Sequence, residues 1–465
     1  MARVTPKKRE RIVIVREREV VGIERDRTLQ AWTTGSDVNS TVQQEGFHSL
    51  PNKPTNDDKT FIDCYDGCSF FEDLRPLFWS LKLTGLFFHR RETSAGKFIV
   101  SKWVVLCAAV CAVTLGNSLR SLFVFKRGEP FDEVLFFKVQ LCIWSVEGFA
   151  KTTVMFVASY KKELLPLFFK LWREICKDKK PDKFLKFVMR NAIMISWNFS
   201  IVNTIGVAVT FFFVPDLEDL FLNATLPGAA HADVKLPYKI MMIVLVYFAS
   251  SVAVSSVTLL VVLSVAVTRE FFVVNKDLSS QISSDGKFTA GLEDYRLRHQ
   301  GLCRVVDVLD DIFMIMIAFI LISNIPLCCV ILYNLIYTSR HFSILLLNLF
   351  WLFFLTFHMT VVAVICAYIN MGAHAPLSII YNIKAEFLKE RPLELTMFLN
   401  RLTGNDIGLS ALKMFVINRP AILTMIGMLI TYFVLLVQFK SPFSSNCTCS
   451  LNSTGATWNG TLTPT

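Results

Sequence analysis

Seven stretches of the chain are apolar enough to cross a membrane. Each is close to or above the roughly 20 residues that an α-helix needs to span the hydrocarbon core. Backbone N–H and C=O groups find no water there, so a spanning segment must pair them internally as a helix. The pattern predicts an all-α, seven-transmembrane bundle with spans at residues 98–125, 131–158, 187–213, 238–267, 309–336, 342–368 and 420–439.

The remaining segments have distinct compositions. Residues 1–70 mix charged, Ser, Asn and Pro residues, which predicts a region without fixed structure. Residues 71–97 alternate Phe, Leu and Trp with basic residues, a pattern typical of an amphipathic helix lying at the inner interface or packed on the inner ends of the bundle. The spans form one receptor or channel domain at 98–440, and 441–465 is a polar tail.

Two long connections, 268–308 and 369–419, show apolar residues at helical spacing beside charges. We therefore expect the fourth, fifth and sixth helices to continue beyond the membrane. They would form a second layer in which subunits can meet.

Positive charge predicts the orientation of the bundle. Most of the 48 Lys and Arg residues fall on the side of the amino terminus, with a dense group in the 159–186 connection. Positive residues mark cytosolic loops, so the amino terminus is expected in the cytosol and, after seven spans, the carboxyl terminus outside. The positive-inside distribution thus accounts for the net charge of +10, and no nucleic-acid partner is expected.

Glycosylation sequons agree with this orientation. Four lie on the predicted outer side, at Asn223, Asn446, Asn452 and Asn459, and they are expected to carry glycans. Cys447 and Cys449 also fall on this oxidising side, where they either bridge to another subunit or stay free.

Several function classes lack support in the sequence. A metabotropic seven-helix receptor, the main alternative, needs an external amino terminus, and neither Asp-Arg-Tyr after the third span nor Asn-Pro-x-x-Tyr in the seventh occurs. No His cluster, nucleotide loop or nucleophile elbow indicates an enzyme, a metal or a cofactor.

The last span has one mildly polar stripe. At 100° per residue its members fall close to one line along the helix: Thr424, Met428, Thr431, Leu435 and, slightly to the side, Gln438. Either these side chains bond neighbouring helices, or several copies of the helix surround an aqueous pore whose gate combines apolar and polar rings.

The end of this span resembles a known family. Thr431-Tyr432, five apolar residues and Gln438-Phe439 match the TYhhhhhQF motif of the insect gustatory receptors, and RPLFWSLKLTGLFF resembles their lead-in to the first span. The resemblance covers roughly residues 71–440. The segments before and after the spans are long for insect receptors, so we expect a gustatory receptor-like protein. Two alternatives stay open: a source in another animal group, and a light-sensing or silent subunit of the same family.

The resemblance implies a function. Members of the family are ligand-gated cation channels, mostly tetrameric, whose last helix lines the pore. By motif position Gln438 and Phe439 would form the outer gate, Leu435 would line the pore below it, and Thr431 and Tyr432 would brace the helix. We therefore expect a plasma-membrane chemoreceptor that assembles as a homo- or hetero-tetramer in lipid and binds a small molecule.

The resemblance also implies a ligand cavity in the outer half of the first six helices. Aromatic and polar residues there suit a small polar ligand, although each also has an ordinary structural use. Glu147 and Lys151 are four residues apart and are expected to form an ion pair, and His358 is expected to be packed. The candidates are Trp144, Glu147, Asn203, Tyr247, Asn324, Tyr333, Asn348 and Trp351.

The predicted orientation can be tested by glycan mapping in intact cells. We expect the tail between Asn446 and Asn459 to carry glycans and to be cleaved by added protease. A bare tail, shielded from protease until the membrane is permeabilised, would contradict the orientation.

Overall fold

A computed structural model describes residues 61–63, 65, 68–93, 98–129, 132–176, 183–226, 235–282, 292–337, 341–383, 392–404 and 406–440. All of them belong to one compact unit, Lys59–Thr465. The sequence predicted no fixed structure for residues 1–70, but residues 61–63 form a strand and residues 69–70 begin a helix. The predictions for residues 1–60 and for the tail, with its three sequons and Cys447 and Cys449, lie outside the described part of the chain.

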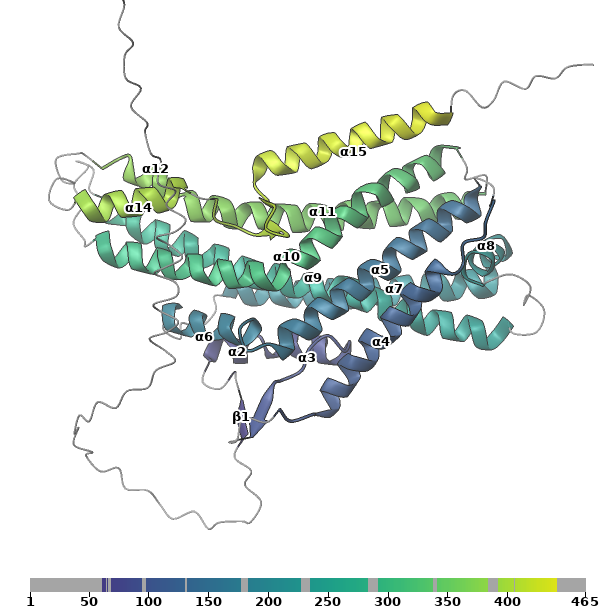
Figure 1. Ribbon diagram of the computed structural model, residues 1–465, viewed down its shortest axis with the longest axis horizontal. Coiled ribbons are helices and arrows are strands. Elements are labelled where there is room, and N and C mark those ends of the chain that lie inside the picture. Colours follow the sequence, from purple (N-terminus) through teal and green to yellow (C-terminus); the bar gives the residue numbers. More distant parts are fainter. Residues whose placement is uncertain are drawn as a thin grey trace, which may run out of the picture. The chain divides into compact units, whose positions relative to one another are not determined.

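The predicted fold is confirmed. Within the described ranges, seven helices are long and apolar enough to cross a membrane, and they pack into one bundle (Figure 1). They are α4 (Lys102–Leu122), α5 (Glu133–Tyr160), α7 (Lys183–Phe213), α9 (Lys235–Ser280), α10 (Leu292–Tyr337), α11 (Phe342–His374) and α15 (Arg419–Lys440).

Three of the helices extend beyond their predicted spans. Helices α9 and α10 have 46 residues each, or about 69 Å at 1.5 Å per residue, more than twice the thickness of a hydrocarbon core. Helix α11 continues through His374 into the short α12 (Pro376–Ile380), and α14 (Pro392–Gly404) packs beside α12. The helical spacing in the long connections therefore predicted this second layer correctly.

Residues 71–97 do not form the single helix that the sequence predicts. They contribute to α2 (Ser69–Asp73), α3 (Arg75–Leu83) and strand β2 (Arg91–Thr93), which pairs antiparallel with β1 (Phe61–Asp63). Gly85 ends the helical run with φ +70°, and a Cβ there would lie 2.6 Å from Val110 Cγ2, so this turn requires glycine.

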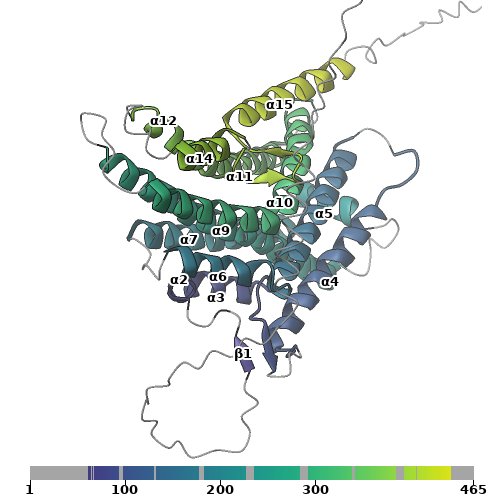
Figure 2. The ribbon, with the colours of Figure 1, turned by 60° about the vertical axis from the view of Figure 1, so that its left-hand side comes forward.

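The segment packs on the bundle. Helix α2 lies against α6 (Leu165–Cys176), as Figure 2 shows. Helix α3 contacts α7 and α9. The Phe70 ring stacks on Trp172 at 4.4 Å between centroids, and Phe71 and Phe78 meet Phe169 at 5.1 and 5.7 Å. The packed alternative from the sequence therefore describes the segment.

A small hairpin, which the sequence did not predict, fixes the chain just before α15. Its strands β3 (Ser410–Ala411) and β4 (Phe415–Val416) are antiparallel. The Asp310 carboxylate of α10 accepts hydrogen bonds from the Ser410 backbone N and Oγ at 2.6 and 2.9 Å. Asn370 Nδ2 of α11 donates to the Ile407 carbonyl at 3.0 Å. The entry to α15 is thereby tied to two spans.

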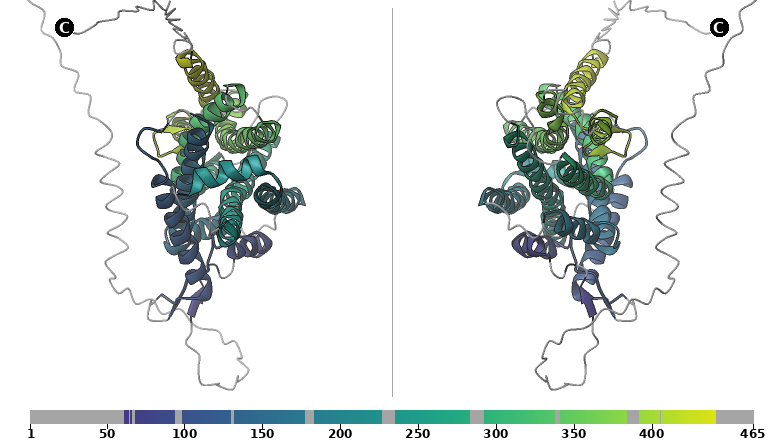
Figure 3. Two further views of the ribbon diagram at one scale, coloured as in Figure 1. Left: turned by 90° about the vertical axis from the view of Figure 1, so that its right-hand side faces the viewer. Right: turned by 90° about the vertical axis from the view of Figure 1, so that its left-hand side faces the viewer.

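Helix α15 lies at the margin of the bundle in both end views (Figure 3). It packs on α10, and only 6% of the residues in its apolar membrane-spanning stretch are buried. Met425 and Leu429 lie on the packed side, where Cys329 Sγ approaches the Leu429 carbonyl at 3.7 Å. Most of the helix surface is therefore free in a single chain.

The aromatic cluster around Phe169 is expected to stabilise the packing of the amino-terminal segment on α6. The Phe169→Ala substitution leaves a buried cavity, so it should lower the free energy of unfolding by about 3 to 5 kcal/mol. Phe213→Ala is the matched control because Phe213 is 77% exposed. Thermal denaturation of the detergent-solubilised variants measures both, and equal effects would contradict the prediction.

Candidate functional site

A cavity lies between the first six spans. Its volume is about 130 Å³, and its walls come from α4, α5, α7, α9, α10 and α11 together with α8 (Pro215–Thr225). No lining residue belongs to α15. The cavity and the last helix are therefore separate features of the chain.

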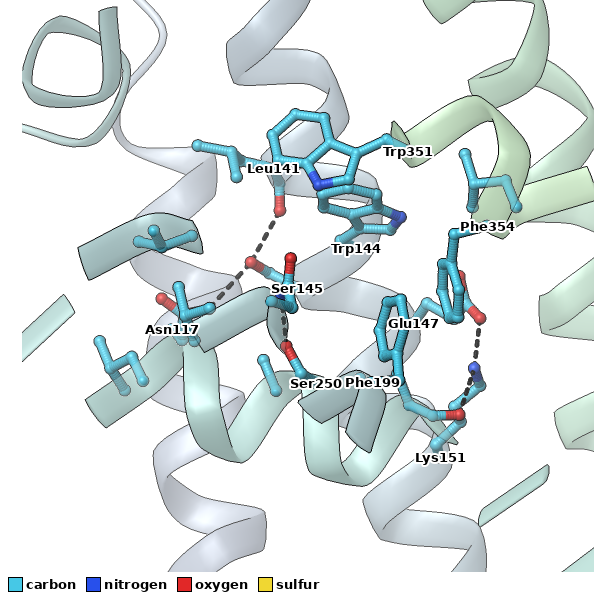
Figure 4. A pocket seen from close by; sticks show the side chains of 18 of the residues that line it. Asn117, Leu141, Trp144, Ser145, Glu147, Lys151, Phe199, Ser250, Trp351 and Phe354 are labelled. Carbon is cyan, nitrogen blue, oxygen red and sulfur yellow. Dashed lines mark hydrogen bonds and ion pairs between the residues drawn. The ribbon is translucent and has the colours of Figure 1, made fainter. Parts of the chain in front are cut away.

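Aromatic rings form much of the wall (Figure 4). Trp144 of α5 and Trp351 of α11 meet edge to face, with centroids 4.6 Å apart and planes at 83°. Phe199 of α7 stacks on Phe354 of α11 at 3.7 Å. Such walls suit the flat apolar body of a small molecule.

A buried ion pair crosses one side of the cavity. Lys151 Nζ lies 2.6 Å from Glu147 Oε1, and the two side chains are 1% and 6% exposed. Ser323 Oγ of α10 donates to Glu147 Oε2 at 2.7 Å, and Lys151 Nζ donates to the Ala253 carbonyl of α9 at 3.4 Å. The pair predicted from the four-residue spacing is confirmed, and its charges cancel within the wall.

Two buried polar atoms at the cavity lack a partner among the described residues. Asn324 Nδ2 donates to His358 Nδ1 at 3.3 Å, so Nε2 of a neutral His358 carries the hydrogen. Asn324 Oδ1 and His358 Nε2 make no other hydrogen bond. A buried polar atom without a partner is costly, and both residues belong to the lining of the cavity.

Polar residues also line the side formed by α4, α5, α7 and α9. Asn117 Nδ2 donates to Ser145 Oγ at 2.9 Å (Figure 4), and Asn203 Nδ2 donates to Ser250 Oγ at 2.6 Å. Arg120 of α4 lines the cavity as well. The site thus combines aromatic walls with amides, hydroxyls and a cation.

The structure brings together five of the eight residues that the sequence proposed for ligand binding: Trp144, Glu147, Asn203, Asn324 and Trp351. The other three do not line this cavity. Tyr247 lies beside the stripe of Met242, Val246 and Ser250 and turns away from it, because successive residues on a helix differ by 100°.

The remaining two proposed residues, Tyr333 and Asn348, also lie outside the lining of the cavity. Tyr333 is nine residues, about 13.5 Å of rise, beyond Asn324, and its ring packs against Phe136 at 5.1 Å between centroids. Asn348 is buried in α11, one turn before Trp351.

Other lining residues were missed in the sequence. Phe354 and His358 follow Trp351 at spacings of three and seven residues, so helical periodicity could have found Phe354 and could have shown that His358 lines the cavity. The involvement of Asn117, Arg120 and Phe199 depends on how α4 and α7 pack, which their own sequences do not reveal.

The proposed gate residues lie on the free side of α15. Thr431, Tyr432, Leu435 and Gln438 are exposed in the single chain, and Thr431 Oγ1 donates to the Gly427 carbonyl of its own helix at 2.8 Å. The side chain of Phe439 lies outside the described part. Asn223, the one proposed glycosylation site that the structure describes, is exposed on α8.

The sequence and the fold both have known counterparts. A family model described as "7tm Chemosensory receptor" matches residues 74–442. No curated protein matches the sequence.

Among solved structures, the insect olfactory receptor OR5 from Machilis hrabei in complex with eugenol is similar, with a TM-score of 0.62 and 12% identity over 80% of this chain and 98% of that one. A second structure of OR5 gives a TM-score of 0.60 and 12% identity over 79% and 98%. At this identity the likeness shows a shared fold.

The buried ion pair yields a stability prediction. Glu147→Gln or Lys151→Met alone leaves one buried charge without its partner, so each should destabilise the protein by about 3 to 5 kcal/mol. The double variant removes both charges and should recover most of that loss. Thermal denaturation measures the cycle, and additive losses would show that the two side chains act independently.

Proposed function

The chain belongs to the 7tm chemosensory receptor family, and we propose that it is a ligand-gated cation channel of the gustatory receptor type. A small molecule binds in the cavity between the first six spans. The last helix of several copies, four in our proposal, surrounds the pore.

One observation carries this proposal: the polar stripe of α15 points away from its own chain. Thr424, Met428, Thr431, Leu435 and Gln438 are all exposed, while the packed side of the helix faces α10. Polar groups that face lipid find no hydrogen-bond partners there, whereas the same groups around a shared axis can face water. One copy cannot enclose such an axis, so assembly is part of the proposal.

The size and the walls of the cavity suit a small ligand that contains a ring. Its volume of about 130 Å³ and its paired aromatic walls suit one ring and a few substituents. The similar OR5 receptor is named in complex with eugenol, a small aromatic molecule. For this chain we propose that a small aromatic molecule binds between the spans that surround Trp144 and Trp351.

Filling the cavity is expected to block activation. Gly148 of α5 lines the cavity, and a Cβ built there meets no atom within 4 Å, so Gly148→Leu should project into open space without destabilising the helix. We expect ligand-evoked current under voltage clamp to fall at least tenfold. Gly116→Leu, on the exposed face of α4 where a Cβ also meets nothing, is the matched control. Unchanged activation of the Gly148→Leu channel, with normal surface expression, would place the ligand elsewhere.

The gate is tested by permeation. Gln438→Ala removes an amide from every copy around the axis, so the ratio of Na⁺ to K⁺ permeability or the unitary current should change at least twofold. Ile430→Ala is the control, since Ile430 is exposed but lies about 120° from the stripe. If the two substitutions have the same effect, the stripe does not line the pore.

A further inference from the structure

The guanidinium of Arg120 is held at the cavity wall by neutral oxygens. Nη1 donates to the Thr225 carbonyl at 2.7 Å and to Tyr238 Oη at 3.2 Å. Nε and Nη2 donate to Asn117 Oδ1 at 3.3 and 3.0 Å. These bonds use four of the five guanidinium donors and leave one Nη2–H available.

The orientation of Asn117 is fixed by a chain of hydrogen bonds. Ser145 Oγ donates to the Leu141 carbonyl at 2.7 Å, so it accepts from Asn117 Nδ2 at 2.9 Å. The amide oxygen of Asn117 must then face Arg120. The position of the guanidinium is therefore set before any ligand arrives.

Arg120 differs from three other basic residues of the spanning helices that are buried or half-buried as it is. Lys138, Lys151 and Lys239 lie 2.5 to 2.8 Å from the carboxylates of Glu129, Glu147 and Glu218. Arg120 has no carboxylate within ion-pair distance in the part of the chain that the structure describes. A charge in a spanning helix is costly without a partner, and three of these four helix cations have one.

The charge balance of the cavity also indicates that Arg120 needs a counterion. Its lining contains Arg120, Lys151 and Glu147 as charged groups. Lys151 and Glu147 neutralise each other, which leaves one positive charge, and that charge belongs to the residue with a free donor. The missing counterion is therefore best supplied from inside the cavity.

We propose that the cavity selects small aromatic ligands that carry a carboxylate, and this inference rests on the proposed function of the same site. The carboxylate binds Arg120 and replaces the absent counterion. The ring lies between the Trp144–Trp351 and Phe199–Phe354 pairs. Asn117 is a positioning residue that holds the guanidinium in its bound orientation.

The test uses matched compounds and two readouts. Benzoate, hydroxybenzoates and phenylpropionate are compared with their primary amides, which keep the size and ring but lack the charge. Binding to the detergent-solubilised full chain is measured by equilibrium titration, and current is measured separately in cells. We expect the wild-type protein to bind carboxylates roughly ten- to a hundredfold more tightly than amides, the range of a charge-assisted hydrogen bond.

Two substitutions remove the preference by opposite routes. Arg120→Gln removes the cation, so the carboxylate advantage should vanish while amide affinity changes less than about twofold. Asn117→Asp keeps Arg120 and gives it an internal carboxylate, so the ligand's carboxylate should again lose its advantage. Arg127→Gln removes the same charge from an exposed position in the α4–α5 connection and should leave the preference intact.

The outcomes separate this inference from the proposed function. Currents evoked equally by amides and carboxylates, unaffected by Arg120→Gln, support the channel but overturn the carboxylate preference. Carboxylate-selective binding without current supports the preference and contradicts the channel. If Arg120→Gln fails to fold, Asn117→Asp still decides, because unchanged carboxylate selectivity in that variant overturns the inference. No measurable carboxylate binding to the wild-type protein also overturns it.

Discussion

The absence of water from the hydrocarbon core is the constraint on which the rest of the structure depends. A polar group there is stable when it finds a partner within the protein, and several of those described find one in their own helix. Ser118 and Thr204 return their hydroxyls to carbonyls four residues earlier, at 2.9 and 2.7 Å. Glu147 and Lys151 neutralise each other one turn apart. Polar side chains that bond within their own helix leave the rest of its surface free to pack through apolar groups.

Both proposed functional sites include groups for which this rule is relaxed. Among the described residues, Asn324 Oδ1 and His358 Nε2 lack partners beside the cavity, and Arg120 has no counterion at the same cavity. The stripe of α15 ends in the exposed Gln438. These groups lie in two separate places, one inside the first six spans and one on the last helix. They are not the full set of unmet groups, since Asn334, which does not line the cavity, also has both amide atoms buried without a partner among the described residues.

The sequence predicted what depends on composition and local spacing. The seven spans and the Glu147–Lys151 pair follow from runs of apolar residues and from a four-residue interval, and five of the eight proposed ligand residues line one cavity. Tertiary packing decided the rest. The rotation of α9 turns Tyr247 away, and Arg120 reaches its place through Thr225 and Tyr238, which are 105 and 118 residues distant. The turn at Gly85, which ends the expected helix of residues 71–97, depends on Val110 of another element.

Helix α10 meets the cavity, the hairpin and the last helix along one continuous element. Asn324 lines the cavity, Asp310 holds Ser410 at the start of the chain into α15, and Cys329 touches the middle of α15. Asp310 and Asn324 are 14 residues apart, about 21 Å along a stiff rod. In the proposed channel, a small tilt of this segment on ligand entry would move Ser410 and with it the base of α15. Pro326 lies between this segment and Cys329, so the contact at the midpoint of α15 can move separately.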